Sequence, residues 1–125
     1  MKTPDTIKLH SQSKILELVY GDESYELSCE LLRVCSPSAE VRGHGEGQEV
    51  LQTGKKHVGI GEIKPVGNYA VQLVFDDGHD TGLYSWEYLW DLCRHREKYW
   101  QEYLARLHEA GASRDPDIQV MRFEP

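Results

Sequence analysis

The segment LVFDDGHDTGLYSWEYL, residues 73–89, places an apolar run, an acidic turn and the start of a helix within one short length of chain. A second segment, LVYGDESYELSCELL at residues 18–32, repeats this order. Each begins in an apolar strand, turns at Asp and Gly, continues in a second short strand and ends in Ser-x-Glu-x-Leu. Asp and Gly supply the positive-φ positions of a tight hairpin, and a serine hydroxyl caps the first turn of a helix. Both segments therefore predict an antiparallel hairpin followed by a helix.

The helix after the second hairpin is the clearest predicted element. Apolar residues recur at helical spacing from the Ser85 cap to Gly111, a residue type that commonly ends helices. The predicted stripe consists of Leu89, Leu92, Cys93, Arg96, Tyr99, Trp100, Tyr103, Leu104 and Leu107. We expect an α+β fold with antiparallel strands in two hairpin–helix units and one long C-terminal helix packed on the sheet. The domain is expected to span residues 1–114, with a flexible tail at 115–125 unless residues 118–123 add an edge strand.

The bulk composition is that of a single globular domain. The chain has 125 residues, of which 39% are hydrophobic and 28% charged, and a formal net charge of −7. Nucleic-acid binding needs clustered cations, so this acidic chain is not expected to bind nucleic acid. No segment is long and apolar enough for a membrane span, and the first residues lack the apolar core of a secretory signal. Three scattered cysteines argue against a disulfide framework, and we expect a cytoplasmic protein.

A predicted loop of residues 35–56 joins the two units, and loops of this length usually serve a function. Its glycine-rich part, GHGEG at 43–47, lacks the spacing of a dinucleotide-binding motif, and TGKK at 53–56 lacks the first glycine of a Walker A loop. Nucleotide binding is therefore not expected. No nucleophile–base pair or pair of convergent carboxylates stands out either, so we predict that the chain is not an enzyme.

His79 in the acidic turn has two interpretations. It is either a polar turn residue bonded to a neighbouring aspartate, or a metal ligand, because neutral imidazole binds zinc and iron. In the second case His44 and Cys35 of the loop would complete a partial zinc or iron site with His79. His44, Glu46 and His79 also imitate a two-histidine, one-carboxylate iron triad, but the chain is too short for the fold that usually presents that triad.

Several segments together resemble the DUF971 family, small proteins similar to the N-terminal domain of gamma-butyrobetaine hydroxylase and trimethyllysine hydroxylase. These segments are LLRVCSPSAEVRGHG (31–45), LQTGKK (51–56) and PVGNYAVQLVFDDGHDTGLYSWEYL (65–89), followed by the long helix. The resemblance runs from about Ile7 to Arg114. It implies an α+β fold of antiparallel strands with helices on one side.

The same resemblance bears on metal binding. In the hydroxylases this domain resembles a zinc module, with three cysteines after the first helix and one histidine in the later acidic turn. His79 matches that histidine, but the cysteine positions correspond here to Ser36, Ser38 and Val41. A structural zinc site needs four good ligands, so the family zinc site is expected to be lost. Similar domains are fused to P-loop ATPases that carry iron–sulfur clusters, which implies a helper role in metal-cofactor handling.

We therefore expect a non-catalytic interaction module that binds a protein, with an iron–sulfur carrier P-loop ATPase as the candidate partner. The expected surface joins the loop to the acidic turn, because both follow equivalent positions of the two similar units. It consists of Arg33, Ser36, Ser38, Glu40, Arg42, His44, His79, Asp80 and Trp86. The alternative, a metal-binding protein that uses His79, His44 and Cys35, stays open at this point.

Overall fold

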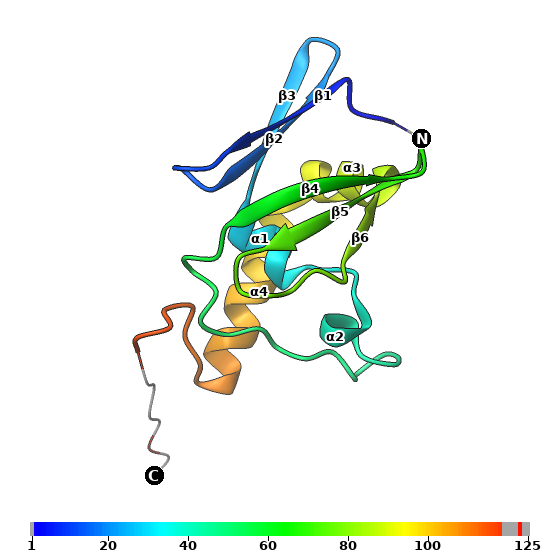
Figure 1. Ribbon diagram of the computed structural model, residues 1–125. Helices are drawn as coiled ribbons and strands as arrows, with labels where there is room; N and C mark the ends of the chain where they lie inside the picture. Colours follow the sequence, from blue (N-terminus) through cyan, green and yellow to red (C-terminus); the bar gives the residue numbers. More distant parts are fainter. Residues whose placement is uncertain (1, 119–122, 124–125) are drawn as a thin grey trace.

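The computed structural model describes residues 2–118 and 123, which form two three-stranded antiparallel sheets and four helices (Figure 1). The strands are β1 (Thr6–His10), β2 (Ile15–Tyr20), β3 (Glu23–Ser28), β4 (Ile60–Val66), β5 (Ala70–Phe75) and β6 (Leu83–Ser85). The helices are α1 (Cys29–Val34), α2 (Ala39–Arg42), α3 (Trp86–Arg94) and α4 (Arg96–Ala110). The sheets have the orders β1–β2–β3 and β4–β5–β6. The predicted α+β class is confirmed.

Both predicted hairpin–helix units are present. β2 pairs with β3 and β5 pairs with β6, each antiparallel. Ser28 Oγ accepts a hydrogen bond from the Leu31 N–H at 3.0 Å, and Ser85 Oγ accepts one from the Tyr88 N–H at 3.1 Å. The two serines therefore cap the helices that follow their hairpins, because a side-chain oxygen satisfies an N–H of the first turn that has no partner in the helix.

Each unit also carries a third strand. β4 pairs with β5 and has a register shift between Ile60 and Glu62. β1 pairs with β2 over its whole length. The sequence did not predict β1, because only Ile7 and Leu9 of its five residues, TIKLH, are strongly apolar. Its stabilisation comes from pairing with β2 rather than from its own pattern.

The long C-terminal helix is interrupted at His95, which corrects the expectation of one continuous helix. His95 has φ −125° and ψ 26°, outside the helical region, so the chain divides into α3 and α4. α3 contacts β3 and β6, whereas α4 contacts α1. Arg96, placed in the apolar stripe by its spacing, is exposed and donates to the Glu26 carbonyl at 3.0 Å. The break lets the two halves of the stripe pack against different parts of the fold.

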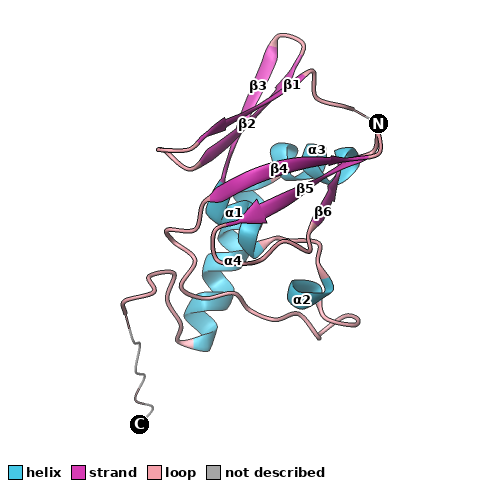
Figure 2. Ribbon diagram, viewed as in Figure 1, coloured by secondary structure: helices cyan, strands magenta, loops and turns pink. Residues whose placement is uncertain are grey.

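The main hydrophobic core joins both sheets to α1 and α3. Its fully buried side chains include Leu16, Leu18, Leu27, Leu32, Leu73, Tyr84, Leu89 and Leu92. A second, smaller cluster unites α1 and α4 through Val34, Tyr103 and Leu107. Figure 2 shows α2 set apart from the other helices, within the long connection that leads from α1 to β4. That connection, predicted as a loop, therefore holds a short helix of its own.

Residues as far as Arg114 are bonded to the rest of the domain. The Gly54 N–H donates to the Ser113 carbonyl at 3.0 Å, and the Arg114 guanidinium makes two bonds of 2.7 and 2.8 Å to the Glu30 carboxylate. The expected tail at 115–125 and the alternative edge strand at 118–123 fall mostly outside the described residues. Within the described part of the chain, no helix has the length and apolar character to cross a membrane.

Candidate functional site

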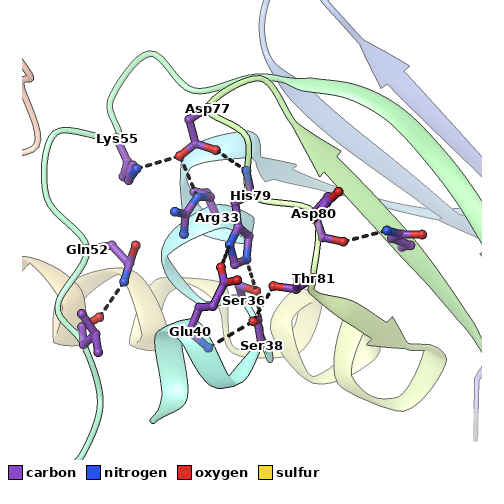
Figure 3. Close-up of polar contacts among 12 residues, drawn as sticks. Arg33, Ser36, Ser38, Glu40, Gln52, Lys55, Asp77, His79, Asp80 and Thr81 are labelled. Carbon is purple, nitrogen blue, oxygen red and sulfur yellow. Dashed lines mark hydrogen bonds and ion pairs between the residues drawn. The ribbon is translucent and has the colours of Figure 1, made fainter.

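His79 follows β5 in the acidic turn, and its side chain connects that turn to the connection after α1 (Figure 3). The residue is 4% exposed. Its Nε2 lies 2.8 Å from Ser36 Oγ, and its Nδ1 lies 2.9 Å from a carboxylate oxygen of Glu40. The two segments that were expected to lie side by side are thus joined through one imidazole ring.

For the neutral form of the ring, the chemistry of the hydrogen-bond partners assigns the protons. A carboxylate only accepts, so Nδ1 carries the hydrogen and donates to Glu40. Nε2 then has a free lone pair, and Ser36 donates its hydroxyl hydrogen to it. The Ser36 oxygen in turn accepts the Ser38 N–H at 3.2 Å. Each polar atom in this buried chain has a partner, as buried polar groups require.

Ser38 makes a second connection between the same two segments. Its Oγ lies 2.6 Å from Thr81 Oγ1 and also accepts the Glu40 N–H at 3.1 Å. The serine is therefore the N-cap of α2. Because α2 is only four residues long, its position depends on these side-chain bonds more than on helix propensity.

Asp77 anchors the other end of the acidic turn (Figure 3). Its carboxylate accepts bonds from Arg33 Nε at 2.9 Å, Lys55 Nζ at 2.7 Å and the His79 N–H at 3.2 Å. Burial alone would raise the pKa of Asp77, but these donors outweigh it and lower the pKa to about 2. Arg33 is itself buried, and its Nη1 has no partner among the described residues. The carboxylate thus ties α1, the loop and the turn together.

The structure separates the residues of the expected partner-binding surface into groups. Those that meet at the imidazole, or beside it, are largely buried: Arg33, Ser36, Ser38 and His79. The exposed members are Glu40, Arg42, His44 and Asp80. Trp86 lies at the opposite end of β5 from His79, where its Nε1 donates to the Asn68 carbonyl at 2.7 Å. A partner is therefore able to touch only part of the predicted set directly.

The residues around His79 do not fit a metal ion. Both ring nitrogens are already in hydrogen bonds, and Ser36 Oγ stands 2.8 Å from the nitrogen that would have to bind the metal. A zinc–nitrogen bond is about 2.0–2.1 Å and needs further anionic or imidazole ligands. Across the described residues, no three His, Cys, Asp or Glu side chains gather to hold a metal, and this includes His79, His44 and Cys35.

The order Ser36–His79–Glu40 has the connectivity of a nucleophile, a base and an orienting acid, which the sequence did not reveal. In a hydrolase the substrate reaches the nucleophile and the orienting acid is buried, whereas here the serine is buried and the acid is exposed. Ser36 is 1% exposed, whereas the Glu40 side chain is 61% exposed. A Cβ added to Gly82 would lie 2.6 Å from Ser36 Oγ, so the Gly82 backbone covers the hydroxyl. The arrangement is that of a structural connection rather than a site that a substrate can reach.

A pocket of about 800 Å³ opens beside this connection, between the α2 segment and helices α3 and α4. We call it the α2–α4 groove. Its lining residues are Val34, Cys35, Ser36, Val41, Arg42, Gly43, Gly45, Glu46, Glu49, Tyr88, Tyr99, Glu102, Ala105 and Arg106. A volume of this size lies within the usual range for ligand and peptide sites. The groove includes Arg42 of the predicted surface.

Sequence reasoning missed the α3 and α4 side of the groove. Tyr88, Tyr99, Glu102 and Arg106 belong to the helical segment that was interpreted as a packing element. Tyr99 was assigned to the buried stripe, whereas it is only half-buried and lines the groove. The available signal was the number of charged residues on this helix, which indicates an accessible surface but not what lies opposite it.

Comparison with known proteins places the chain in a family. The family described as gamma-butyrobetaine hydroxylase-like, N-terminal, matches residues 7–90. The chain belongs to this family. The matched part contains the first hairpin–helix unit, the loop with its serines, the second hairpin with His79 in its turn and the start of α3. No curated protein matches the chain.

Three solved structures of similar proteins agree with this membership. Two are NMR solution structures, both 52% identical to the chain. One has a TM-score of 0.84 and a match over 98% of each chain; the other has a TM-score of 0.78 and covers 100% of this chain and 95% of its own. The third is the crystal structure of a DUF971 family protein of unknown function from Acidithiobacillus ferrooxidans. It is 41% identical, with a TM-score of 0.56, and the match covers 69% of this chain and 86% of that chain. The resemblance to the DUF971 family is confirmed.

Proposed function

We propose that this family member is a non-catalytic accessory module that docks onto a partner protein through the α2–α4 groove. The observation that carries the proposal is the groove itself, an open pocket of about 800 Å³ whose lining includes tyrosine and valine side chains. Apolar and aromatic side chains in a concave site are typical of places where partner residues bury themselves. The absence of an accessible nucleophile at Ser36 supports a docking role over a catalytic one.

The bonds around His79 support the same role. They hold α2, which is one wall of the groove, against the turn after β5. A wall that is fixed in advance loses less conformational entropy of its own when a partner binds. In this proposal the buried serines and His79 position the groove, while Arg42 and its exposed neighbours touch the partner.

As partner we propose a P-loop ATPase that carries iron–sulfur clusters, which makes the module a helper in metal-cofactor handling. The support is the family resemblance, since similar domains are fused to such ATPases, and this is an argument by analogy. We also propose a cytoplasmic location. The three cysteines are all free thiols, which suits a reducing compartment.

A site-specific photocrosslink tests the docking proposal. A photoreactive phenylalanine analogue replaces Ala105, an exposed residue that lines the groove, and in a control variant it replaces Ala110, an exposed residue of the same helix outside the groove lining. We expect the Ala105 variant to crosslink in cells to the iron–sulfur carrier ATPase encoded in the same genome, and the Ala110 variant not to. Equal yields at the two positions, or no adduct at Ala105, would contradict the proposal.

A further inference from the structure

The buried and half-buried residues of the α2–α4 groove lining, which we call its base, include no Asp, Glu, Lys or Arg. The hydroxyls of Tyr88 and Tyr99 already donate to the Cys35 carbonyl and the Asp91 carboxylate. Burial raises the pKa of the Cys35 thiol to about 11, against the pull of the Arg106 and Arg42 guanidiniums, so the thiol is neutral at physiological pH. The polar atoms here need no further partner, and the remaining surface favours apolar groups.

An exposed apolar residue, Val50, is bonded through its backbone to a residue of the groove lining. Val41, which belongs to the base of the groove, is buried, and its carbonyl accepts the Val50 N–H at 2.8 Å. The Val50 side chain is one of the few large apolar side chains that the described chain leaves more than half exposed. An occupant that covered the groove would therefore be able to cover Val50 as well, which extends the site beyond the size of a small metabolite.

The sides of the groove are charged, with an excess of carboxylates. The charged residues of the lining are three glutamates, Glu46, Glu49 and Glu102, and two arginines, Arg42 and Arg106. In the part of the chain that the structure describes, no ion pair joins any two of these five side chains. Arg42 is already engaged, since its guanidinium lies 4.8 Å from the centre of the Tyr88 ring.

Covering the glutamates and arginines of the groove with a bound partner removes water from them, which costs free energy. A carboxylate that loses water without gaining a cation is strongly unfavourable. An occupant must therefore present cations to the three glutamates, and an acceptor to Arg106. The net charge of −7 on the whole chain acts in the same direction, because it attracts basic partners over distance.

We infer that the groove binds a partner segment that is apolar along one side and net basic along the other. This inference rests on the proposed docking function and adds the chemistry of the docking segment. The apolar side fills the base over Val41, Tyr88 and Tyr99 and extends to Val50. The basic side chains meet Glu46, Glu49 and Glu102.

Two synthetic peptides of equal length test the inference. They share their leucine positions, and one carries lysines where the other carries glutamates. Each is titrated into isotope-labelled protein and followed by the amide chemical shifts. We expect the leucine–lysine peptide to shift amides that line the groove, and the leucine–glutamate peptide to bind at least about tenfold more weakly.

Charge-reversal variants distinguish binding in the groove from attraction by the net charge of the protein. In one variant Glu46, Glu49 and Glu102 are replaced by lysine. In a matched control the three replaced residues are Glu26, Glu62 and Glu87, which are exposed and lie outside the groove lining. The two variants have the same net charge. We expect the groove variant to bind the lysine peptide about tenfold more weakly than the control does, with both amide spectra showing the native fold.

Each other outcome counts against the inference. Equal weakening in both variants would mean attraction by net charge alone. Tighter binding of the glutamate peptide, lost in an Arg42→Ala, Arg106→Ala variant, would reverse the assigned charge while leaving the groove as a docking site. Groove shifts that depend on protein concentration alone would make a second copy the occupant. No binding of the lysine peptide would remove the inference, whereas the photocrosslink at Ala105 decides the docking function independently.

Discussion

Ser36 Oγ lies 2.8 Å from His79 Nε2, although the two residues are 43 positions apart in the chain. One belongs to the connection after α1 and the other to the turn after β5. The sequence resemblance places both at positions where related domains carry zinc ligands. In this chain the two positions are joined by a hydrogen bond between a hydroxyl and an imidazole.

His79→Ala is expected to destabilise the fold by about 2–3 kcal/mol. The change removes two hydrogen bonds, leaves the buried Ser36 hydroxyl without its acceptor and opens a cavity. Urea unfolding followed by circular dichroism measures the difference. The control is His44→Ala, an exposed histidine of the same loop, whose expected effect is within about 0.5 kcal/mol. If both variants unfold at the same urea concentration, the imidazole is not the structural connection described here.

Replacing Ser36, Ser38 and Val41 together by cysteine is expected to create a zinc site. The resemblance places the zinc-binding cysteines of the related hydroxylases at these positions, and His79 Nε2 already faces Ser36. Three thiolates and one imidazole make a complete structural zinc set. Elemental analysis of untagged protein should then show about one zinc per chain. The same triple variant with His79→Ala is the control, and zinc retained at full occupancy in that control would show that the metal binds elsewhere.

The buried hydroxyl of Ser36 is expected to resist a fluorophosphonate probe, which labels activated serines that solvent can reach. Ser36, His79 and Glu40 have the connectivity of a catalytic triad, but the Gly82 backbone covers the serine oxygen. Mass spectrometry of the treated protein should find no adduct at Ser36, while a known serine hydrolase in the same tube is labelled. An adduct that disappears in His79→Ala would overturn the non-catalytic proposal.

The repeated order of strand, turn and serine-capped helix was predictable because its signals are local. Ser28 and Ser85 act on N–H groups three residues away, so the information lies within each segment. The break at His95 was not predictable in this way. α3 packs against β3 and β6, whereas α4 packs against α1. The apolar residues keep their helical spacing on both sides of His95, so the spacing does not show that the packing partner of the helix changes there.

The candidate site was predictable only in part, because its geometry also depends on packing between segments that are distant in the sequence. The equivalence of the two units indicated that the loop and the acidic turn lie together. It did not indicate that Ser36 and His79 would be buried, because their burial depends on how the Gly82 backbone passes over the serine. The groove also depends on α4, whose Arg106 approaches Cys35 only through the packing of α4 on α1.

Asp77 is expected to make stability depend on acid pH. Its pKa of about 2 in the fold lies below the ordinary value of 3.8. The stabilisation is therefore present in full above about pH 4 and is lost as the pH falls toward 2, because the unfolded chain takes up the proton first. Asp77→Asn should lose at least about 1 kcal/mol at neutral pH, since Arg33 is left buried without a counter-ion, and should show a flatter profile between those pH values.

The matched control for this change is Asp80→Asn, an exposed aspartate of the same turn. Urea unfolding from neutral pH down to about pH 2 gives the two profiles. The Asp80 variant should keep the acid-dependent loss of stability that the unmodified chain shows. A profile for Asp77→Asn as steep as that of the control would mean that the bonds from Arg33 and Lys55 do not stabilise the folded carboxylate.

Gly43→Ala is expected to distort the wall of the α2–α4 groove. Gly43 has φ 72° and ψ −157°, a conformation that only glycine adopts readily. An added Cβ would lie 2.0 Å from the Gln48 carbonyl oxygen, so the backbone itself would have to move. Gly45→Ala is the control, because nothing lies within 4 Å of the Cβ at that position of the same loop. We expect a loss of at least about 1 kcal/mol for Gly43→Ala, with shifted amides around Val41 and Val50, and near-native behaviour for Gly45→Ala. Equal stability and equal spectra for the two variants would show that the loop does not hold the path that defines the groove.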